Sequence, residues 1–130
     1  MHLKIITHEK VVFDEDVDAI YTKGTDGEFG ILPNHIPVMV ALDIGVTKVV
    51  QGVSEKFFTT MGGVFQFKDN EGLILTTTAE SGEEIDVTRA KAALARAQAR
   101  LSEADAAIDA KRAEAAVARA MARLKATLNK

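Results

Sequence analysis

The chain changes character at IDVTRA, residues 85–90. All nine glycines and both prolines precede this segment, so residues 85–130 contain neither of the residues that most readily interrupt a helix. Seventeen of residues 85–130 are alanine, the strongest helix former. All six arginines also lie in this part, beginning with Arg89. We therefore expect residues 85–130 to be helical and to have a task that needs guanidinium groups.

Residues 1–84 are instead typical of β-structure. Short runs rich in branched and aromatic residues are separated by turn signals at intervals of about ten residues. The segment GVFQFKDNEGLILT, residues 63–76, predicts a hairpin. Many short strands in succession predict an antiparallel β-sandwich over residues 1–84, followed by a two-helix antiparallel hairpin over residues 85–130. The expected strands are LKIIT, DAIYTK, IPVMVAL, VTKVV, KFFTT, GVFQF and LILTTT.

Two narrow apolar stripes run through the helical part at spacings of three and four residues. Stripes of small side chains suit two helices that lie close together, as in an αα-hairpin. No glycine or proline forces a turn between them, so one long helix is an alternative, and the tail can have two states of similar energy. The stripes consist of Leu94, Ala97, Leu101, Ala104 and Ile108, and of Val117, Met121, Leu124 and Leu128.

Aspartates mark the expected starts of the two helices. Asp86 is a suitable N-cap for the first helix, and it lies close enough to Arg89 for an ion pair between positions i and i+3. Asp105 or Asp109 could cap the second helix. The sequence alone leaves the choice between these two aspartates open.

The net charge of −3 hides an unequal distribution. Residues 1–84 carry six lysines against fourteen acidic residues, or −8, whereas residues 85–130 carry ten basic residues against five acidic ones, or +5. A helix advances about 100° per residue, so the arginines form one row on each helix. Such rows are commonly only solvated faces. They can also bind a phosphate or an acidic protein surface, because guanidinium groups pair with oxyanions through two hydrogen bonds. The rows are Arg89, Arg96 and Arg100, and Arg112, Arg119 and Arg123.

Several functional classes lack their sequence signature. There is no cysteine, and His2, His8 and His35 are too scattered for a metal cluster. Neither a Walker motif nor GxGxxG is present, so a bound nucleotide would not lie on a glycine-rich loop. No apolar run approaches the roughly 20 residues of a membrane span, and the N-terminus lacks a signal-peptide pattern. We expect no metal, no required cofactor, and a cytoplasmic protein without direct membrane insertion.

The segment GEFGILPNHIPVMVAL, residues 27–42, is the second marked feature. Its glycines and prolines predict a loop, yet Phe29, Ile31, Leu32 and Ile36 are apolar. Such a loop is either a buried corner of the sandwich or a docking surface for a partner.

Two other functions remain open at this point. Glu28 and His35 raise the possibility of a stand-alone hydrolase, but no second acid, metal ligand or paired nucleophile accompanies them. The basic tail could bind nucleic acid or acidic protein. Residues 85–130 contain no aromatic residue on which a base could stack, which argues against nucleic acid.

The order of these features resembles one family. GEFGILPNHIP in an N-terminal sandwich, followed by IDVTRAKAALARAQARL and a second helix rich in alanine and arginine, is similar to the epsilon subunit of bacterial F-type ATP synthases. The resemblance covers essentially the whole chain. It implies a non-catalytic subunit whose sandwich binds the gamma subunit and the ring of c subunits. It also implies C-terminal helices that switch between a folded hairpin and an extended form, which reaches the alpha/beta catalytic head and inhibits ATP hydrolysis.

The resemblance further implies two sets of site residues. Those that would meet gamma and the c-ring are Glu28, Phe29, Ile31 and His35. In some family members the folded hairpin binds ATP as a regulatory ligand, through a motif that Ile85, Asp86, Arg89 and Ala90 supply here. The positions that accompany this motif are Glu80, Arg96, Arg119 and Arg123.

The implied roles of these residues are simple. Glu80 and Asp86 would accept hydrogen bonds from the adenine amino group or orient the arginines, and the arginines would bind the phosphates. No residue is expected to be catalytic. The family is peripheral to the cytoplasmic face of the bacterial cell membrane, as part of the ATP synthase complex.

Overall fold

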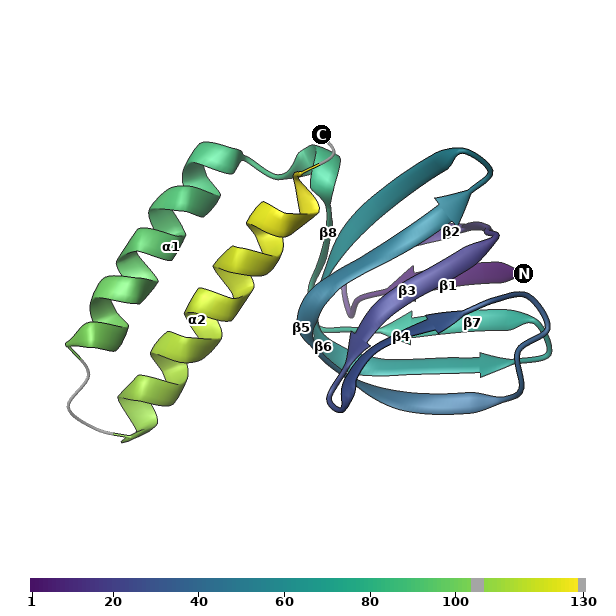
Figure 1. Cartoon of the computed structure of the whole chain (residues 1–130), viewed down its shortest axis with the longest axis horizontal. Helices are drawn as coiled ribbons and strands as arrows, with labels where there is room; N and C mark the ends of the chain where they lie inside the picture. The colour runs from purple at the N-terminus through teal and green to yellow at the C-terminus, as the bar shows by residue number, and fades with distance from the viewer. Residues whose placement is uncertain (104–106, 129–130) are drawn as a thin grey trace.

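The computed structural model describes residues 1–103 and 107–128, without the side chains of residues 107 and 108. Figure 1 shows a β-sandwich with a pair of helices beside it. The chain passes from strand to helix between Ser81 and Val87. The predicted fold class, a sandwich followed by a helical hairpin, is confirmed.

Within the described residues, the sandwich is a single sheet folded over on itself. Its strands follow the spatial order β2-β1-β7-β6-β5-β3-β4, and β8 pairs with β6. Most neighbours are antiparallel, but β1 and β7 run parallel, so the predicted antiparallel pattern has one exception. The strands are β1 (His2–Ile6), β2 (Val11–Asp16), β3 (Ala19–Gly24), β4 (Gly27–Ile31), β5 (Val38–Gln51), β6 (Ser54–Lys68), β7 (Glu71–Leu75) and β8 (Ala79–Ser81).

The two longest strands each join two of the predicted runs. VTKVV and all of IPVMVAL except Ile36 and Pro37 belong to β5, and KFFTT and GVFQF belong to β6. Glycines that suggested turns only bend these strands. Gly63 has φ +109, and a Cβ there would lie 2.0 Å from the carbonyl oxygen of Leu75, so glycine is required where β6 bends over β7. Because β6 pairs with β8 early and with β7 later, it connects the two layers.

Three further points compare the sandwich with the prediction: one is a confirmation and two are differences. The predicted hairpin of residues 63–76 is confirmed, with Asp69 (φ 52) and Asn70 (φ 62) in a two-residue turn. Strand β2 was not expected. It is an edge strand that buries only Phe13, and its acidic residues do not show the apolar pattern of a strand. The first part of the expected loop, GEFGI, is strand β4, because it pairs back onto β3 through a tight turn.

The core of the sandwich is apolar and closely packed. Phe13 and Phe58 contact edge to face at 5.3 Å, and Phe29 and Phe65 do so at 5.7 Å. The fully buried core residues include Leu3, Ile5, Ile20, Ile31, Val49, Phe65, Phe67 and Ile74. This core does not include the helices, which form a separate small cluster with the sandwich surface.

The hairpin consists of α1 (Val87–Ser102) and α2 (Ala107–Ala126). Figure 1 shows α2 lying between α1 and the sandwich, and α2 contacts α1, β5 and β6. Of the two proposed caps for α2, Asp105 lies outside the described residues, and Asp109 lies within the first turn and so is not the N-cap.

The first apolar stripe faces inward as predicted. Ala97 is buried and Leu94 and Leu101 are half-buried, while Ala104 and the side chain of Ile108 lie outside the described residues. The second stripe is partly wrong, because Met121 is 55% exposed and Leu128 is 78% exposed.

Alanines are buried in place of Met121 and Leu128. Because α2 lies between α1 and the sandwich, it must bury two sides. Ala120 and Ala122 are both buried, and a separation of two residues turns about 200° around the helix axis. The buried alanines of α2 are Ala113, Ala120, Ala122 and Ala126.

A charged cluster joins β1 to the edge strand β2. The ring of His2 lies between two carboxylates, with Nε2 at Asp14 and Nδ1 2.8 Å from Asp16. Glu71 of β7 is the parallel partner of His2, and Lys4 lies two residues along β1. The hydrogen bonds to Asp14 and Asp16 raise the pKa of His2, against an opposing effect of desolvation.

Substitution of His2 by glutamine tests this cluster through pH. The folded pKa of His2 is above its ordinary value of 6.5, so its stabilising contribution is complete below pH 6.5 and is lost as the pH rises through the folded pKa. We expect the urea midpoint of wild type to exceed that of His2→Gln at about pH 5.5 and the two to converge at about pH 9. The control is His8→Gln, since His8 is exposed and pairs with its neighbour Glu9. An equal pH-dependent difference in the control would contradict the assignment.

Candidate functional site

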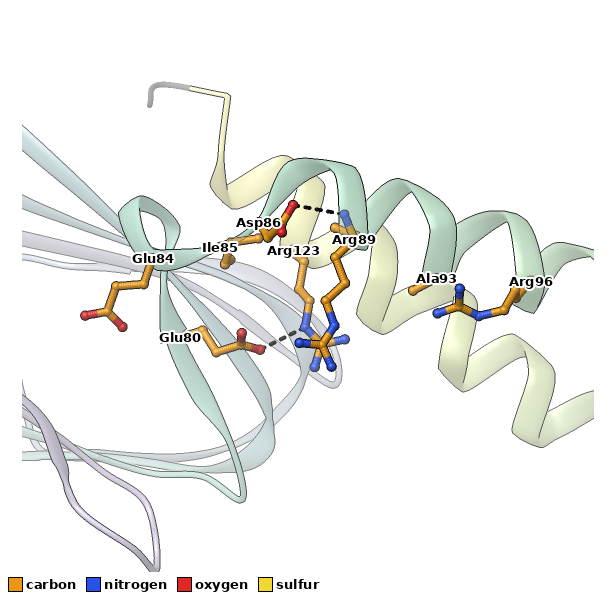
Figure 2. A pocket seen from close by; sticks show the side chains of 9 residues that line it. Glu80, Glu84, Ile85, Asp86, Arg89, Ala93, Arg96 and Arg123 are labelled. Carbon is orange, nitrogen blue, oxygen red and sulfur yellow. Dashed lines mark hydrogen bonds and ion pairs between the residues drawn. The ribbon is translucent and has the colours of Figure 1, made fainter.

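A hollow of about 420 Å³ opens where β8, the start of α1 and the last turns of α2 meet. This volume is within the range of small-molecule sites. Figure 2 shows charged side chains from all three segments around it. The lining residues are Glu80, Glu84, Ile85, Asp86, Arg89, Ala90, Ala93, Arg96 and Arg123.

Asp86 fixes where α1 begins. Its backbone is extended (φ −79, ψ 109), and its Oδ1 accepts a hydrogen bond from the backbone N–H of Arg89 at 3.0 Å. This is the N-cap interaction predicted for Asp86. The expected ion pair between the two side chains does not form within the described residues, because the side chain of Arg89 extends away from Asp86 and toward Glu80 (Figure 2). The cap thus sets the first turn from which Arg89 points into the hollow.

Arg123 ties the end of α2 to the sandwich. Its Nε donates to Oε1 of Glu80 at 2.8 Å, and the two side chains are only 30% and 36% exposed. Figure 2 shows Arg89 extending in the same direction as Arg123, beside Glu80. Within the described residues, the guanidinium groups of Arg89 and Arg96 have no acidic partner. The hollow therefore offers two unpaired guanidinium groups and a third shared with one carboxylate, which suits an anion with several oxygens.

One predicted residue lies elsewhere. Arg119 lines a second hollow of about 650 Å³ together with Arg100, Arg112, Glu103 and Asp109. It precedes Arg123 by one helical turn, toward the end of the hairpin that is distant from β8. The two arginine rows are thus divided between two hollows along the hairpin.

Two residues of the first hollow were missed by sequence reasoning. Glu84 could have been found from its position just before Ile85, in the 3-10 turn (Gly82–Glu84) that leads into α1. Ala93 is a small residue on the face of α1 that carries Arg89 and Arg96, so helical spacing could have found it.

The other predicted set lies at the β3–β4 side of the sandwich. Glu28 is exposed, and its Oε1 lies 3.6 Å from Nζ of Lys125 on α2. Phe29 is half-buried against Phe65. Ile31 is only 2% exposed, so its inclusion among surface contacts is corrected here, because its side chain belongs to the core.

The exposed apolar side chains of this region are in the loop after β4. Leu32 is 57% exposed and Ile36 is 74% exposed. His35 is half-buried, with its ring against Phe67 and Nδ1 2.7 Å from the carbonyl oxygen of Ile36. The side chains of Glu28 and His35 therefore have separate surroundings, and neither supports the other in general acid–base chemistry.

Two further observations concern the described residues as a whole. They contain no group of three or more histidine, cysteine, aspartate or glutamate side chains that could hold a metal ion. Neither of the two helices described is both long enough and apolar enough to cross a membrane.

Comparison with known families agrees with the sequence resemblance. The β-sandwich domain of the ATP synthase delta/epsilon chain matches residues 1–82, and the long α-helix domain of the same chain matches residues 83–127. The epsilon chain of Desulforamulus reducens is 47% identical over 102 residues, which cover 77% of this chain and 76% of the relative. The epsilon chain of Pelotomaculum thermopropionicum is 46% identical, covering 78% and 75%.

Solved structures share the fold. A chain in the OSCP/F1/c-ring structure of Euglena gracilis mitochondrial ATP synthase has a TM-score of 0.83 at 26% identity, covering 97% of this chain and 79% of that chain. A chain in the central stalk and c-ring structure of Tetrahymena thermophila mitochondrial ATP synthase has a TM-score of 0.64 at 19% identity, covering 98% and 96%.

The fold and both matched domains define a chain of the delta/epsilon class. This protein belongs to the ATP synthase epsilon chain family, whose members are non-catalytic subunits of that enzyme. The predicted family is therefore confirmed, and the stand-alone hydrolase suggested by Glu28 and His35 is wrong. The match extends through the helices, so the tail is part of the family fold.

The capping role of Asp86 can be tested separately from any ligand. Loss of an N-cap side chain costs about 1 kcal/mol, so Asp86→Ala is expected to lower amide protection in the first turn of α1 roughly fivefold. Asp86→Ser keeps an oxygen at the cap and should retain protection close to that of wild type. Native-state hydrogen exchange measures both. Equal protection in wild type and Asp86→Ala would contradict the assignment.

Proposed function

We propose that this chain is the central-stalk epsilon subunit that couples the rotor to the c-ring and regulates ATP hydrolysis. In this proposal, ATP stabilises the folded hairpin, and the extended form of the same helices inhibits hydrolysis. The observation that carries it is the hollow beside β8. Arg123 is 43 residues from Glu80 in sequence. It lines the same site as Glu80 and Arg89 because the hairpin is folded back.

The chemistry of the hollow favours a nucleoside triphosphate. Arg89 and Arg96 are exposed and free to bind phosphate oxygens, and Arg123 lies next to them. Glu80 and Asp86 supply acceptors that can receive hydrogen bonds from an adenine amino group. When ATP binds, Arg123 would either leave Glu80 for the phosphates or interact with both. A ligand held by β8, α1 and α2 together stabilises the folded hairpin, because the extended form cannot provide all three.

The forces that hold the hairpin without ligand are small. The contact with the sandwich rests on a cluster around Ile85, Ala90 and Ala126 and on two ion pairs, Arg123–Glu80 and Lys125–Glu28. Ion pairs near the surface contribute about 0–1 kcal/mol each. A change in the folded-to-extended ratio from 1:99 to 99:1 requires a preference of about 5.5 kcal/mol. A tight anionic ligand can therefore decide between the two forms.

The extended form has an electrostatic rationale. Residues 85–130 carry a net charge of +5, against −8 in residues 1–84. Release from the acidic sandwich leaves a basic helix that suits acidic segments of the alpha/beta catalytic head. The arginines would then exchange intramolecular partners for partners on the head.

The sandwich provides the attachment to the rotor. Glu28, Phe29 and His35 border a loop in which Leu32 and Ile36 are exposed, and such an apolar surface suits contact with gamma and the c-ring. The Euglena chain that shares this fold comes from an assembly that contains the c-ring. The chain would lie at the cytoplasmic face of the bacterial membrane only through these partners.

Calorimetric titration of ATP into wild type and Arg123→Ala tests the site. We expect measurable binding by wild type and at least tenfold weaker binding by Arg123→Ala, since both a phosphate ligand and the link to Glu80 are lost. Arg112→Ala is the matched control, because Arg112 lines the other hollow and should leave the affinity within about twofold of wild type. Indistinguishable heats for wild type and Arg123→Ala would contradict the proposal.

Deletion of residues 86–130 tests the inhibitory role. ATP synthase assembled with the truncated chain is expected to hydrolyse ATP faster than the complex with the full chain, while proton pumping remains coupled to hydrolysis. Hydrolysis and proton pumping are measured on the same membranes. If the truncated complex hydrolyses ATP no faster than the full-length complex, the inhibitory role is wrong.

A further inference from the structure

The backbone at Gly82 makes an unusually close contact with the end of α2. A Cβ at position 82 would lie 2.1 Å from the carbonyl oxygen and 2.9 Å from the carbonyl carbon of Ala126, and 3.4 Å from the carbonyl oxygen of Phe57. Carbon and oxygen atoms without a bond between them do not approach to 2.1 Å, because attraction is optimal at separations of about 3.5–4.0 Å. Any side chain at position 82 therefore displaces the last turn of α2.

The backbone conformation of Gly82 does not itself require glycine. The glycines with positive φ are Gly27, Gly52, Gly62 and Gly63 within the described residues, and Gly82 is not among them. Alanine could adopt the same φ and ψ without strain. What glycine provides at position 82 is room for α2, and this separates docking of the hairpin from the folding of the 3-10 turn.

The other contacts at this junction are few. Ile85, Ala90 and Ala126 are buried together, with Val46 and Phe57 of the sandwich packed against them. Lys125 and Glu28 form a pair in which both side chains are more than half exposed. This cluster is separate from the core of the sandwich, so loss of the junction should release the hairpin and leave the sandwich folded.

We propose that Gly82 and Ala126 form a docking seat for the hairpin. This docking seat determines the fraction of molecules that hold the hairpin against the sandwich, whether or not nucleotide is present. Glu80 lies two residues before Gly82, and Arg123 lies one helical turn before Ala126. The docking seat therefore sets the distance between the two sides of the hollow. Its effect on ATP affinity rests on the proposed function, whereas its effect on docking does not.

The experiment measures docking in the full-length chain without ATP. The sequence contains no cysteine, so spin labels can be placed at Val53→Cys and Lys111→Cys, both exposed and away from the junction. We expect a narrow distance distribution in the wild-type background and a broad distribution displaced from it in Gly82→Ala. Glu83→Ala is the matched control, because Glu83 is the exposed neighbour in the same turn, and it should keep the narrow distribution.

A second substitution approaches the docking seat from the other side. Ala126 is 3% exposed, so Ala126→Leu should displace α2 as Gly82→Ala does. Amide exchange in β1 and β7, which lie outside the contact of α2 with β5 and β6, should be unchanged in both variants. The proposal is overturned if both variants keep the wild-type distances, or if β1 and β7 lose protection together with the hairpin.

Addition of ATP to the labelled chains separates this inference from the proposed function. If the docked fraction falls from nearly all to about one tenth, the apparent Kd for ATP rises about tenfold, because only docked chains bind. ATP should then narrow the distance distribution of Gly82→Ala, but at an ATP concentration about tenfold higher than the wild-type chain needs for binding. Failure of ATP to bind either chain would contradict the proposed ATP regulation. The distances measured without ATP would still test whether Gly82 and Ala126 form the docking seat.

Discussion

The close packing of α2 between α1 and the sandwich is the interaction on which the rest of the molecule depends. It is possible because the buried positions of α2 are alanines and because Gly82 has no side chain. Larger residues would bury more apolar area and hold the hairpin more firmly. Small residues instead allow close approach with little stabilisation. This contact brings Arg123 to Glu80 and thereby creates the hollow.

The distribution of charge has the same consequence. The acidic sandwich and the basic tail attract each other, yet the pairs that form between them, Arg123–Glu80 and Lys125–Glu28, are half-exposed or exposed. Water and salt screen such pairs, so they orient the hairpin more than they stabilise it. A basic tail held this weakly can exchange its partners for a polyphosphate or an acidic protein. In the proposed function, that exchange of partners is how the tail regulates hydrolysis.

Sequence reasoning succeeded where a signal is local and failed where it depends on a neighbour. Short runs of branched and aromatic residues between turn signals, and an alanine-rich segment without glycine or proline, predicted the two parts of the fold. Glycines did not reveal whether the chain reverses or only bends, so β5 and β6 were each divided in two. Met121 and Leu128 appeared to be a buried stripe, because nothing in the periodicity shows that α2 contacts two surfaces. Family resemblance brought Glu80 into the candidate site, and helical spacing had already placed Arg123 in a row of arginines. Only the folded chain shows that Glu80 and Arg123 pair.

The motif IDVTRA illustrates why local sequence is not enough to establish a ligand site. Its Asp and Arg are three residues apart because an N-cap carboxylate accepts from the backbone N–H at that distance along the chain. Any capped helix can show this spacing, so the motif by itself indicates a helix start. Arg89 becomes part of a candidate site because Arg123 and Glu80 lie across from it, and in the proposed docking seat the contact between Gly82 and Ala126 holds these two residues together. A chain with the motif but without that contact would form the same first helix and offer an anion only the arginines of that helix, without Arg123 and Glu80.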